Sequence, residues 1–379
     1  MDLFEFEAKE IFHKYQISIP KGEVVETPED AKRIAEKVGL PVVIKAQVLS
    51  GKRGKGGGIK FVKTMDEVEI VSAELLGKEL YGLKIEKLLL YHMVPEGQEL
   101  YLGFTVDRSM KHYVAIVSSA GGMDIEEVAE QMPEKIVKEH VLPLLGLRSY
   151  QALRMMNKIG YRGKKARNLS QMLMNLWNVV IDYDATMAEI NPAILTPEGE
   201  LVAVDARMTI DDNALYRHPE YKERIEAGLT DLTEREIAAQ KAQAFYVELD
   251  GDIGIIGNGA GLVMATLDVV THFGGKPTNF LDLGGGAPPE RVAKAIEIVT
   301  SHPRVKVLFI NIFGGITRCD YIAQGILDAR NQLSLEIPMV VRMLGTREEE
   351  GRKLLESAGI DVLDTMELAA KRAVELATI

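Results

Sequence analysis

The sequence predicts an α/β protein in two parts: an α+β first half and a second half built on a doubly wound parallel sheet. In the first 120 residues, strand-like runs lie close together, which favours antiparallel hairpins over helical crossovers. From residue 250, strands alternate with helices in five units, a pattern typical of a parallel sheet covered on both faces. A charge-rich stretch with little strand character, 219–246, lies between the halves. We therefore expect a boundary near residue 240 and domains over 1–240 and 241–379.

In the first half, the sequence predicts a helix over 5–15 and a second helix that begins after Thr27, because threonine followed by proline and two acids is a typical helix start. The expected strands are short and apolar. They cover 42–44, 58–62, 87–93, 99–107 and 112–118. A long helix is expected over 165–182, with a core-facing stripe at three- and four-residue spacing. The stripe consists of Leu169, Met172, Leu173, Leu176, Trp177 and Val180.

In the second half, strands and helices are expected to alternate. The strands cover 252–257, 278–283, 305–313 and 337–344, and the helices cover 261–273, 288–301, 319–332 and 347–358, before a short last unit. Parallel strands end at one edge of the sheet, and open α/β sheets bind ligands there. The turns that follow these strands are therefore candidate ligand sites.

Acidic residues outnumber basic ones by 56 to 45, a formal net charge of −11 that argues against an overall nucleic-acid binder. Cys319 is the single cysteine, so no disulfide forms within the chain, as is usual in a reducing compartment. The N-terminal segment is charged, and no apolar run of 18 residues occurs. We therefore expect a cytoplasmic protein with no membrane or nucleic-acid partner.

A basic glycine loop breaks this acidic pattern. Six cations and no acid occur between residues 45 and 65, around the run Ser50–Gly58. Glycine backbone amides and these cations suit phosphate binding, although the spacing is not that of a Walker loop. The alternative is that this loop is a solvated hairpin tip that binds no ligand. Lys45 favours the anion site, because it ends an apolar strand and a cation in a sheet needs an anion beside it.

The segment 187–207 is predicted to form a hairpin around a Pro-Glu-Gly turn. If Leu195 opposes Leu201, then Asn191 opposes Asp205, and Glu189 lies on the same face opposite Arg207. Oxygen ligands so placed suit Mg²⁺, which takes its other ligands from phosphates and water. A structural pair of Glu189 with Arg207 is the alternative.

Two glycine-rich turns follow strands in the second half. The turn 257–262 contains Asn258 but ends in Leu262 where a dinucleotide-binding motif needs a small residue, which argues against a nicotinamide cofactor. In the turn 311–320, backbone amides at 315–317 before a helix would hold a phosphate or carboxylate. The alternative for each segment is a tight turn in which the glycines allow close packing and no ligand binds. Cys319 is expected to be a buried small side chain.

Long motifs occur in order along the whole chain. They include LFEFEAKEIF, VVIKAQVLSGKRGKGGGIK, QELYLGFTVDR, AGGMDIEEVAE, AEINPAILTPEGELVAVDAR, DDNALYRHPE, GNGAGLVMATLDVV, NFLDLGGGA and NIFGGITRCD. Together they resemble the β subunits of succinyl-CoA synthetase, a family of ATP-grasp acyl-CoA ligases. The resemblance implies an ATP-grasp fold of two subdomains that binds nucleotide and Mg²⁺, followed by a flavodoxin-like domain that contacts a partner.

The implied partner is an α subunit that carries coenzyme A and a histidine that becomes phosphorylated, in an αβ heterodimer or an α2β2 heterotetramer. The implied reaction forms succinyl-CoA from succinate, CoA and ATP or GTP, through the phosphohistidine and an acyl phosphate. The resemblance assigns nucleotide binding to Lys45, Lys52, Arg53, Gly54, Tyr91, Val94 and Glu99. It assigns Mg²⁺ to Asn191 and Asp205, and orientation of the partner histidine to Glu189. It assigns the carboxylate substrate or its acyl phosphate to Asn258, Gly315, Ile316 and Thr317.

Four departures from the family pattern leave alternatives open. Lys52 replaces the first glycine of the usual Gly-Gly-Arg-Gly-Lys loop, the pair 49–50 lacks the usual histidine, Phe4 replaces a histidine, and Tyr91 replaces a glutamate. ATP and GTP both remain open, with ATP favoured. Malate and citrate remain alternatives to succinate. A non-catalytic nucleotide- or CoA-sensing module is the alternative of another class, although it would not need to retain an acid aimed at a histidine.

Overall fold

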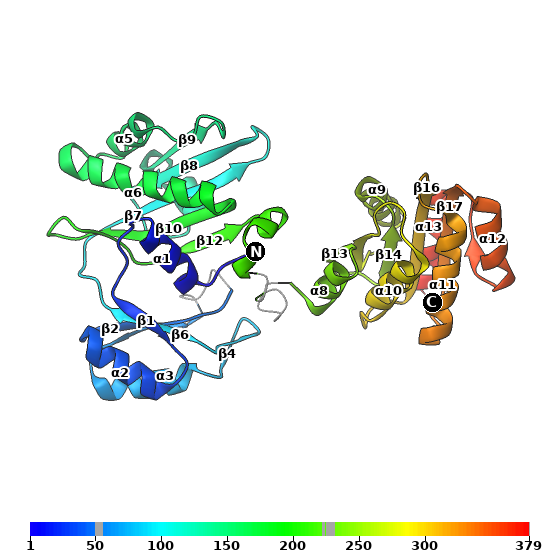
Figure 1. Cartoon of the computed structure of the whole chain (residues 1–379), viewed down its shortest axis with the longest axis horizontal. Coiled ribbons are helices and arrows are strands. Elements are labelled where there is room, and N and C mark those ends of the chain that lie inside the picture. Colours follow the sequence, from blue (N-terminus) through cyan, green and yellow to red (C-terminus); the bar gives the residue numbers. More distant parts are fainter. Residues whose placement is uncertain (50–55, 222–223, 225–231, 379) are drawn as a thin grey trace. The chain divides into compact units, whose positions relative to one another are not determined.

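A computed structural model describes residues 1–49, 56–221, 224 and 232–378 (Figure 1). The chain divides into two compact units, Met1–Asp231 and Leu232–Ile379. The division lies before helix α8 (Glu234–Lys241), which packs on helix α10 (Pro289–Thr300) of the second unit, and so precedes the expected boundary near residue 240. The two units are described separately below.

The first unit contains a small antiparallel sheet in the order β1-β6-β2-β3. Its strands are β1 (Gly22–Val25), β6 (Leu88–His92), β2 (Val42–Ala46) and β3 (Ile59–Val62). Helices α2 (Pro28–Val38) and α3 (Met65–Leu75) pack on one another and cover one face (Figure 1). Thr27 caps α2 by accepting from the Asp30 amide, which confirms the predicted helix start. A short hairpin of β4 (Glu79–Leu80) and β5 (Leu83–Lys84) follows α3.

A larger antiparallel sheet in the first unit has the order β11-β10-β7-β8-β9, with β12 also paired to β10. Its strands are β7 (Gln98–Asp107), β8 (His112–Ser118), β9 (Ile136–Val141), β10 (Ala185–Leu195), β11 (Leu201–Ala203) and β12 (Arg207–Ile210). The helices packed with it are α1 (Glu5–Lys14), α5 (Ser149–Lys158) and α6 (Gly163–Asp182). All six residues of the predicted stripe on α6 are buried in its core, so that prediction is confirmed.

The other described elements of the first unit are short. They are α4 (Ile125–Gln131) and the 3₁₀ turns Pro133–Lys135, Asp212–Arg217 and Pro219–Tyr221. The strands predicted between residues 42 and 118 are present and antiparallel, as expected.

The second unit is a doubly wound sheet in the order β13-β15-β14-β16-β17-β18. Its strands are β13 (Phe245–Glu248), β14 (Ile253–Gly257), β15 (Asn279–Asp282), β16 (Val307–Gly314), β17 (Met339–Gly345) and β18 (Asp361–Val362). The last five pair in parallel, as predicted, whereas β13 is antiparallel at the edge. The expectation that 219–246 has little sheet character is therefore wrong at Phe245 and Tyr246. These residues extend along β15, and Tyr246 buries its ring in the core of this unit.

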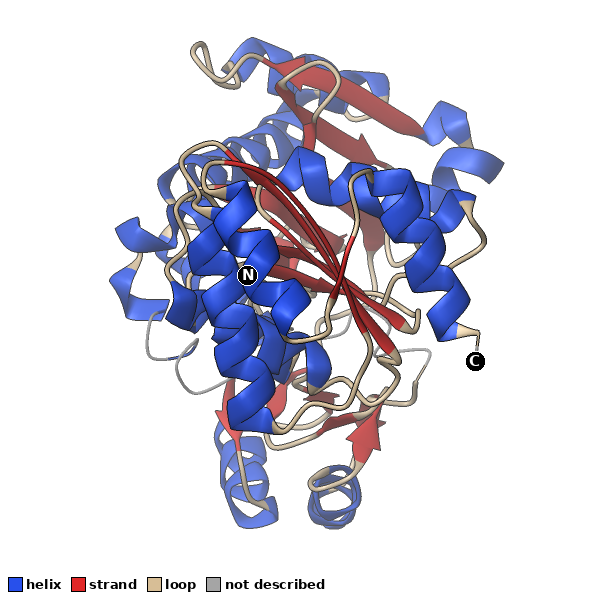
Figure 2. Cartoon of the chain, turned by 90° about the vertical axis from the view of Figure 1, so that its right-hand side faces the viewer, coloured by secondary structure: helices blue, strands red, loops and turns tan. Residues whose placement is uncertain are grey.

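Helices lie on both sides of this sheet (Figure 2). Helices α10 (Pro289–Thr300), α11 (Cys319–Leu333) and α12 (Glu348–Ser357) pack in one apolar cluster, and α9 (Ala260–His272) and α13 (Met366–Ala377) pack in another. Cys319 is buried, as predicted, and burial raises the pKa of its thiol to about 11. Among the described residues, no helix has both the length and the apolarity to cross a bilayer.

Candidate functional site

Lys45 lies in the middle of the small sheet of the first unit and is 3% exposed. Its ammonium is 3.0 Å from Glu5 Oε1 and 3.5 Å from Asp205 Oδ1, and it donates to the carbonyl of Val204 at 3.3 Å. The sequence predicts that an anion must meet this cation, and the protein itself supplies two carboxylates. A nucleotide phosphate at Lys45 therefore stays a prediction.

Glu5 and Lys9 belong to the same cluster, and sequence reasoning missed both. They are four residues apart in α1, and their side chains pair at 2.7 Å with almost no exposure. Lys9 also lies 4.3 Å from the centre of the Tyr91 ring, and burial lowers the pKa of Lys9 to about 8. The sequence could have indicated this pair, because Glu5 and Lys9 are four residues apart and lie on the same buried helix face as Ala8 and Phe12.

Tyr91 lies on β6, directly opposite Val43 of β2, and is 2% exposed. Both lysine ammonium groups of the cluster lie beside its ring, with that of Lys45 5.5 Å from the ring centre, and burial raises the pKa of the Tyr91 hydroxyl. Tyr91 is therefore buried beside Lys9 and Lys45 rather than on an open surface. Val94 follows the same strand and is half-buried.

The register of the predicted hairpin is confirmed on both sides of its centre. Leu195 pairs with Leu201, and Glu189 pairs with Arg207. Asn191 and Asp205 lie where the ladder is interrupted, next to the cis Asn191-Pro192 bond and the hydrogen bond from the Val204 amide to the Pro192 carbonyl. Arg207 has Asp2 as an ionic partner at 3.7 Å, which weakens the alternative of a structural pair with Glu189.

The Asn191 amide is held by the loop that precedes α4. The Gly122 amide donates to Asn191 Oδ1 at 2.8 Å, and Asn191 Nδ2 donates to the Met123 carbonyl at 2.8 Å. Gly122 has a φ of +71°, and a Cβ there would lie 2.3 Å from Glu99 Oε2. The loop thus places Gly122 next to both Glu99 and Asn191. Its positive φ favours glycine, and a side chain there would displace the Glu99 carboxylate.

The donor set fits the hard cation that the sequence predicts. Asp205 supplies a carboxylate that accepts from the Ala206 amide at 3.0 Å, and Asn191 Oδ1 retains a second lone pair beside its bond from Gly122. Within the described residues, no cluster of three or more His, Cys, Asp or Glu side chains has metal-binding geometry. Two oxygen ligands suit Mg²⁺ completed by water and phosphates, rather than a metal held in a protein cage.

Glu189 lies on β10 beside β7 and is held by a side chain of that neighbouring strand. Its Oε2 accepts from the Tyr101 hydroxyl at 2.9 Å, and burial raises the pKa of the Glu189 carboxyl. Gly103 lies opposite Glu189, and a Cβ on Gly103 would lie 2.6 Å from the Tyr101 hydroxyl. Glu99, Tyr101 and Gly103 are spaced two residues apart along β7, and this spacing indicates from the sequence that they share one face of the sheet.

Lys52, Arg53 and Gly54 lie outside the described residues, so the predicted glycine loop is not part of the geometry above. The strands on either side of it, β2 and β3, pair as expected, with Lys45 opposite Ile59. The first unit therefore brings together Lys45, Tyr91, Asp205 and Asn191 from four separate segments, with Glu189 on the same strand as Asn191 and Glu99 on the neighbouring strand β7.

In the second unit, three turns meet at the carboxyl ends of β14, β15 and β16. Asn258 Nδ2 donates to the Phe313 carbonyl at 2.9 Å and to Thr317 Oγ1 at 3.3 Å, and Asn258 Oδ1 accepts from the Phe313 amide at 2.9 Å. The Gly286 amide donates to Thr317 Oγ1 at 2.9 Å. The run 284–286, for which the sequence predicts no ligand, therefore lies against the predicted turn.

The amides of this turn differ from the prediction in one respect. The Gly315 amide donates to the Phe313 carbonyl at 3.2 Å. This amide is therefore already hydrogen-bonded, whereas the prediction takes it to be free to bind a ligand. Helix α11 begins at Cys319, and residues 315–317 form the turn before it. Ile316 is 89% exposed, whereas Thr317 is buried. A ligand would approach this turn from the Ile316 side.

Arg342 is a cation in an apolar strand that sequence reasoning missed. It lies opposite Asn311 in β17, and its Nη1 donates to Asn311 Oδ1 at 3.4 Å. Its buried Nε has no hydrogen-bond partner in the described part of the chain, and its guanidinium lies 5.9 Å from the centre of the Phe313 ring. The sequence feature that could have identified Arg342 is the one that identified Lys45: a cation that follows β-branched residues in an apolar strand.

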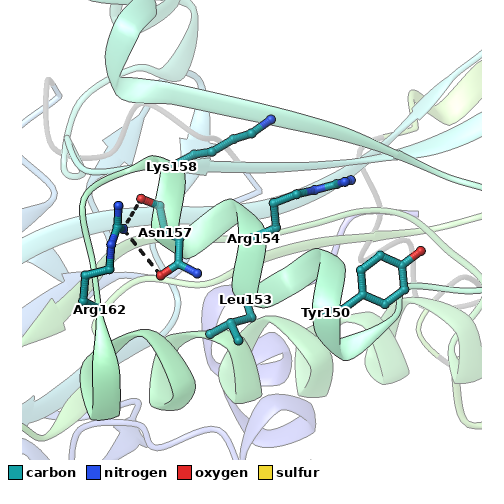
Figure 3. A pocket seen from close by; sticks show the side chains of 6 residues that line it. All are labelled: Tyr150, Leu153, Arg154, Asn157, Lys158 and Arg162. Atoms are coloured by element: carbon teal, nitrogen blue, oxygen red, sulfur yellow. Dashed lines mark hydrogen bonds between the residues drawn. The ribbon is translucent and has the colours of Figure 1, made fainter.

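A surface pocket on α5 contains none of the predicted site residues (Figure 3). Its two arginine side chains bond to the protein itself: Arg162 donates to the carbonyl of Tyr161 at 2.8 Å, and Arg154 pairs with Glu139. This pocket is therefore separate from the predicted site.

The fold and the site together define a class of ligase in which an ATP-grasp domain precedes a CoA-ligase domain. The family described as ATP-grasp domain matches residues 2–195, and the family described as CoA-ligase matches residues 256–376. The chain is 46% identical to the succinate–CoA ligase [ADP-forming] subunit beta of Pyrobaculum islandicum and 44% identical to that of Herpetosiphon aurantiacus, over the full length of all three chains. The chain belongs to the family of succinate–CoA ligase β subunits, and it is an enzyme subunit.

A solved structure shows the same fold at low sequence identity. The ATP citrate lyase of Methanothrix soehngenii, in complex with citrate and coenzyme A, matches with a TM-score of 0.74 and 18% identity over 99% of both chains. At this identity the match concerns the fold. It supports the prediction of an ATP-grasp domain followed by a doubly wound α/β domain.

Proposed function

We propose that the chain is the β subunit of a ligase that forms succinyl-CoA from succinate, CoA and ATP, releasing ADP and phosphate. One observation carries this proposal: Lys45 lies against Asp205 of the hairpin that also contains Asn191 and Glu189, although Lys45 is far from this hairpin in the sequence. The identity of 44–46% with named β subunits over their full length supports it. The names of these relatives specify ADP-forming enzymes, which favours ATP over GTP.

In the first unit, the nucleotide site consists of Lys45, Lys52, Arg53, Gly54, Tyr91, Val94 and Glu99, with the buried Tyr91 ring beside Lys45. Asn191 and Asp205 hold Mg²⁺, which neutralises phosphate charge when bound. Glu189 faces the histidine of the partner subunit. Its carboxylate orients one imidazole N–H, so that the other nitrogen accepts the γ-phosphoryl group and ADP leaves.

In the second unit, Asn258, Gly315, Ile316 and Thr317 bind the acid or its acyl phosphate. A succinate carboxylate oxygen attacks the phosphorus of the phosphohistidine, and the histidine nitrogen leaves. The thiolate of CoA, held mainly by the partner subunit, then attacks the acyl carbonyl, and phosphate leaves. The chain therefore acts with an α subunit, as an αβ heterodimer or an α2β2 heterotetramer in the cytoplasm. Residues 1–240 would serve the nucleotide and residues 241–379 the partner.

Copurification with the α partner, followed by assays with succinate, malate and citrate, tests the substrate. Succinate with ATP is expected to give the highest kcat/KM for acyl-CoA formation. A higher kcat/KM with malate or citrate would reassign the acid, since ligases of the same architecture use these acids. Nucleotide binding without any acyl-CoA would favour the non-catalytic sensing module instead.

Replacing Gly315 with valine is expected to block acid activation while nucleotide binding stays unchanged. The position has no positive φ, and a Cβ there meets no atom within 4 Å, so valine fits the fold but occupies the space beside Asn258. The measurement is nucleotide affinity by calorimetry alongside acyl-CoA formation, with Gly315→Ala as the smaller control. Weaker nucleotide binding in Gly315→Val would show that the two sites are not separate.

Replacing Lys52 with glycine tests the choice of purine. The Lys52 ammonium only donates, so beside a purine edge it favours the O6 of guanine over the amino group of adenine. We expect Lys52→Gly to raise the ratio of kcat/KM for ATP over GTP roughly 5-fold, the equivalent of one hydrogen bond worth about 1 kcal/mol. Lys55→Gly in the same loop is the control. An unchanged ratio would show that Lys52 contacts phosphate rather than the base.

A further inference from the structure

The Glu189 carboxylate accepts one hydrogen bond within the described part of the chain. The donor is the Tyr101 hydroxyl, 2.9 Å from Glu189 Oε2. Arg207 is paired with Glu189 across β10 and β12, but its guanidinium has Asp2 as its ionic partner, at 3.7 Å. Glu189 Oε1 therefore keeps its capacity to accept a hydrogen bond from a group of another chain.

The Tyr101 hydroxyl is a donor in a fixed position. Tyr101 lies within β7, a strand that pairs with β8 on one side and with β10 on the other. The residue is 5% exposed, and a tyrosine ring has only two side-chain torsions, so packing leaves the hydroxyl little freedom. The longer Glu189 side chain has three torsions and loses more rotamer freedom when it is held in one place. The hydrogen bond to Tyr101 therefore restricts the carboxylate.

Gly103 leaves space for this hydroxyl. It lies opposite Glu189 in the ladder, and a Cβ there would lie 2.6 Å from the Tyr101 hydroxyl oxygen. Its φ is not positive, so the backbone does not require glycine at this position. Glycine inside a strand is destabilising, because it loses more backbone freedom on folding and has no side chain to pack. The space that a side chain would fill is used by Tyr101 instead.

Arg207 explains why Glu189 needs a second partner to fix its orientation. The two residues are directly opposed in the ladder, and the positive charge of Arg207 favours the ionised form of Glu189. Without the Tyr101 hydroxyl, the carboxylate would be free to turn toward this cation and form an ion pair within the chain. The hydrogen bond from β7 acts against that rotation.

We propose that Tyr101 is a positioning residue that fixes Glu189 Oε2 and thereby leaves Oε1 to accept a hydrogen bond from the imidazole of the partner histidine. Gly103 belongs to the same arrangement, because it leaves the hydroxyl its space. This inference rests on the proposed function, since it takes Glu189 as the residue that orients the histidine. Tyr101 acts through Glu189 and does not itself contact the histidine.

The test is the single-turnover rate at which ATP and Mg²⁺ phosphorylate the partner histidine in the complex with the α subunit. Tyr101→Phe is expected to lower this rate about 10-fold, with the half-saturating ATP concentration within about 2-fold of wild type, because one hydrogen bond to a charged group is lost. Gly103→Ala, which displaces the hydroxyl without removing it, is expected to lower the rate to a similar extent. Thermal unfolding of each variant shows that the fold is retained.

Two double variants separate positioning from a general structural role. In a Glu189→Gln background, which is itself slow, Tyr101→Phe is expected to lower the rate by less than about 2-fold further, because the carboxylate that Tyr101 holds is gone. In a Gly103→Ala background, Tyr101→Phe is likewise expected to add less than about 2-fold, because the hydroxyl is already displaced. Tyr113→Phe is the matched control and is expected to have the wild-type rate. Tyr113 is a half-buried tyrosine of the neighbouring strand, and its hydroxyl has no hydrogen bond among the described residues.

A wild-type rate in Tyr101→Phe, beside a slow Glu189→Gln, would overturn the inference and leave the proposed function in place. Losses that multiply in Tyr101→Phe/Glu189→Gln would also overturn it, because they would show that Tyr101 acts independently of the carboxylate. A wild-type complex that does not phosphorylate the partner would instead contradict the proposed function, so the two failures are distinguishable.

Discussion

Replacing Asp205 with alanine is expected to lower kcat for acyl-CoA formation by at least about 100-fold while the protein remains folded. Asp205 supplies the carboxylate of the proposed Mg²⁺ pair, and Asn191 alone leaves the cation with one neutral protein ligand. The Asp205 side chain is 28% exposed and lies outside the strand ladder, so its removal takes away little core packing. The measurements are kcat at saturating ATP and Mg²⁺ and the midpoint of thermal unfolding.

Glu198→Ala is the matched control, because Glu198 is an exposed carboxylate in the turn of the same hairpin. It is expected to have wild-type kcat and a wild-type unfolding midpoint. Asp205→Asn, which keeps one oxygen ligand, is expected to fall between alanine and wild type. Wild-type turnover in Asp205→Ala would remove the basis for the metal site.

The isolated chain is expected to form no acyl-CoA, even with all substrates present. The proposed reaction needs a carrier that takes phosphate from the nucleotide in the first unit to the turns of the second. The seven histidines of the chain lack the glycine-alanine segment that surrounds the phosphorylated histidine of the family. In this structure His218 is bonded to Asp184 at 3.0 Å, and His302 lies 3.5 Å from Glu248, so both have structural partners. Acyl-CoA made without a partner would contradict the subunit assignment.

The hairpin shows how much of a strand pairing can be predicted from residue spacing alone. The assumed pair of Leu195 with Leu201 gives the correct partners for five further residues of β10, because one pair fixes the register of a regular antiparallel ladder. The same reasoning placed Asn191 and Asp205 together. It did not predict the interruption of the ladder there, or the loop at Gly122 that holds the Asn191 amide, since that loop comes from a segment about 70 residues away.

Lys45 shows the limit of the same kind of reasoning. The strand Val42–Ala46 predicted a buried cation that needs an anion, and this is what the structure contains. The sequence did not identify the anion, because Glu5 comes from a helix that reaches the small sheet only through tertiary packing. The edge strand β13 was missed for a similar reason: its residues become a strand through pairing with β15.

Phosphoryl transfer from γ-labelled ATP tests the central claim most directly, because it asks whether this chain passes phosphate to a histidine on another subunit. The isolated chain and the complex with the α partner are incubated with labelled ATP and Mg²⁺, and acid-labile phosphate is located on each subunit. We expect no label on the isolated chain and label on the partner alone in the complex, lost on addition of succinate and CoA. Acid-labile label on this chain, or an unlabelled partner in an active complex, would contradict the account.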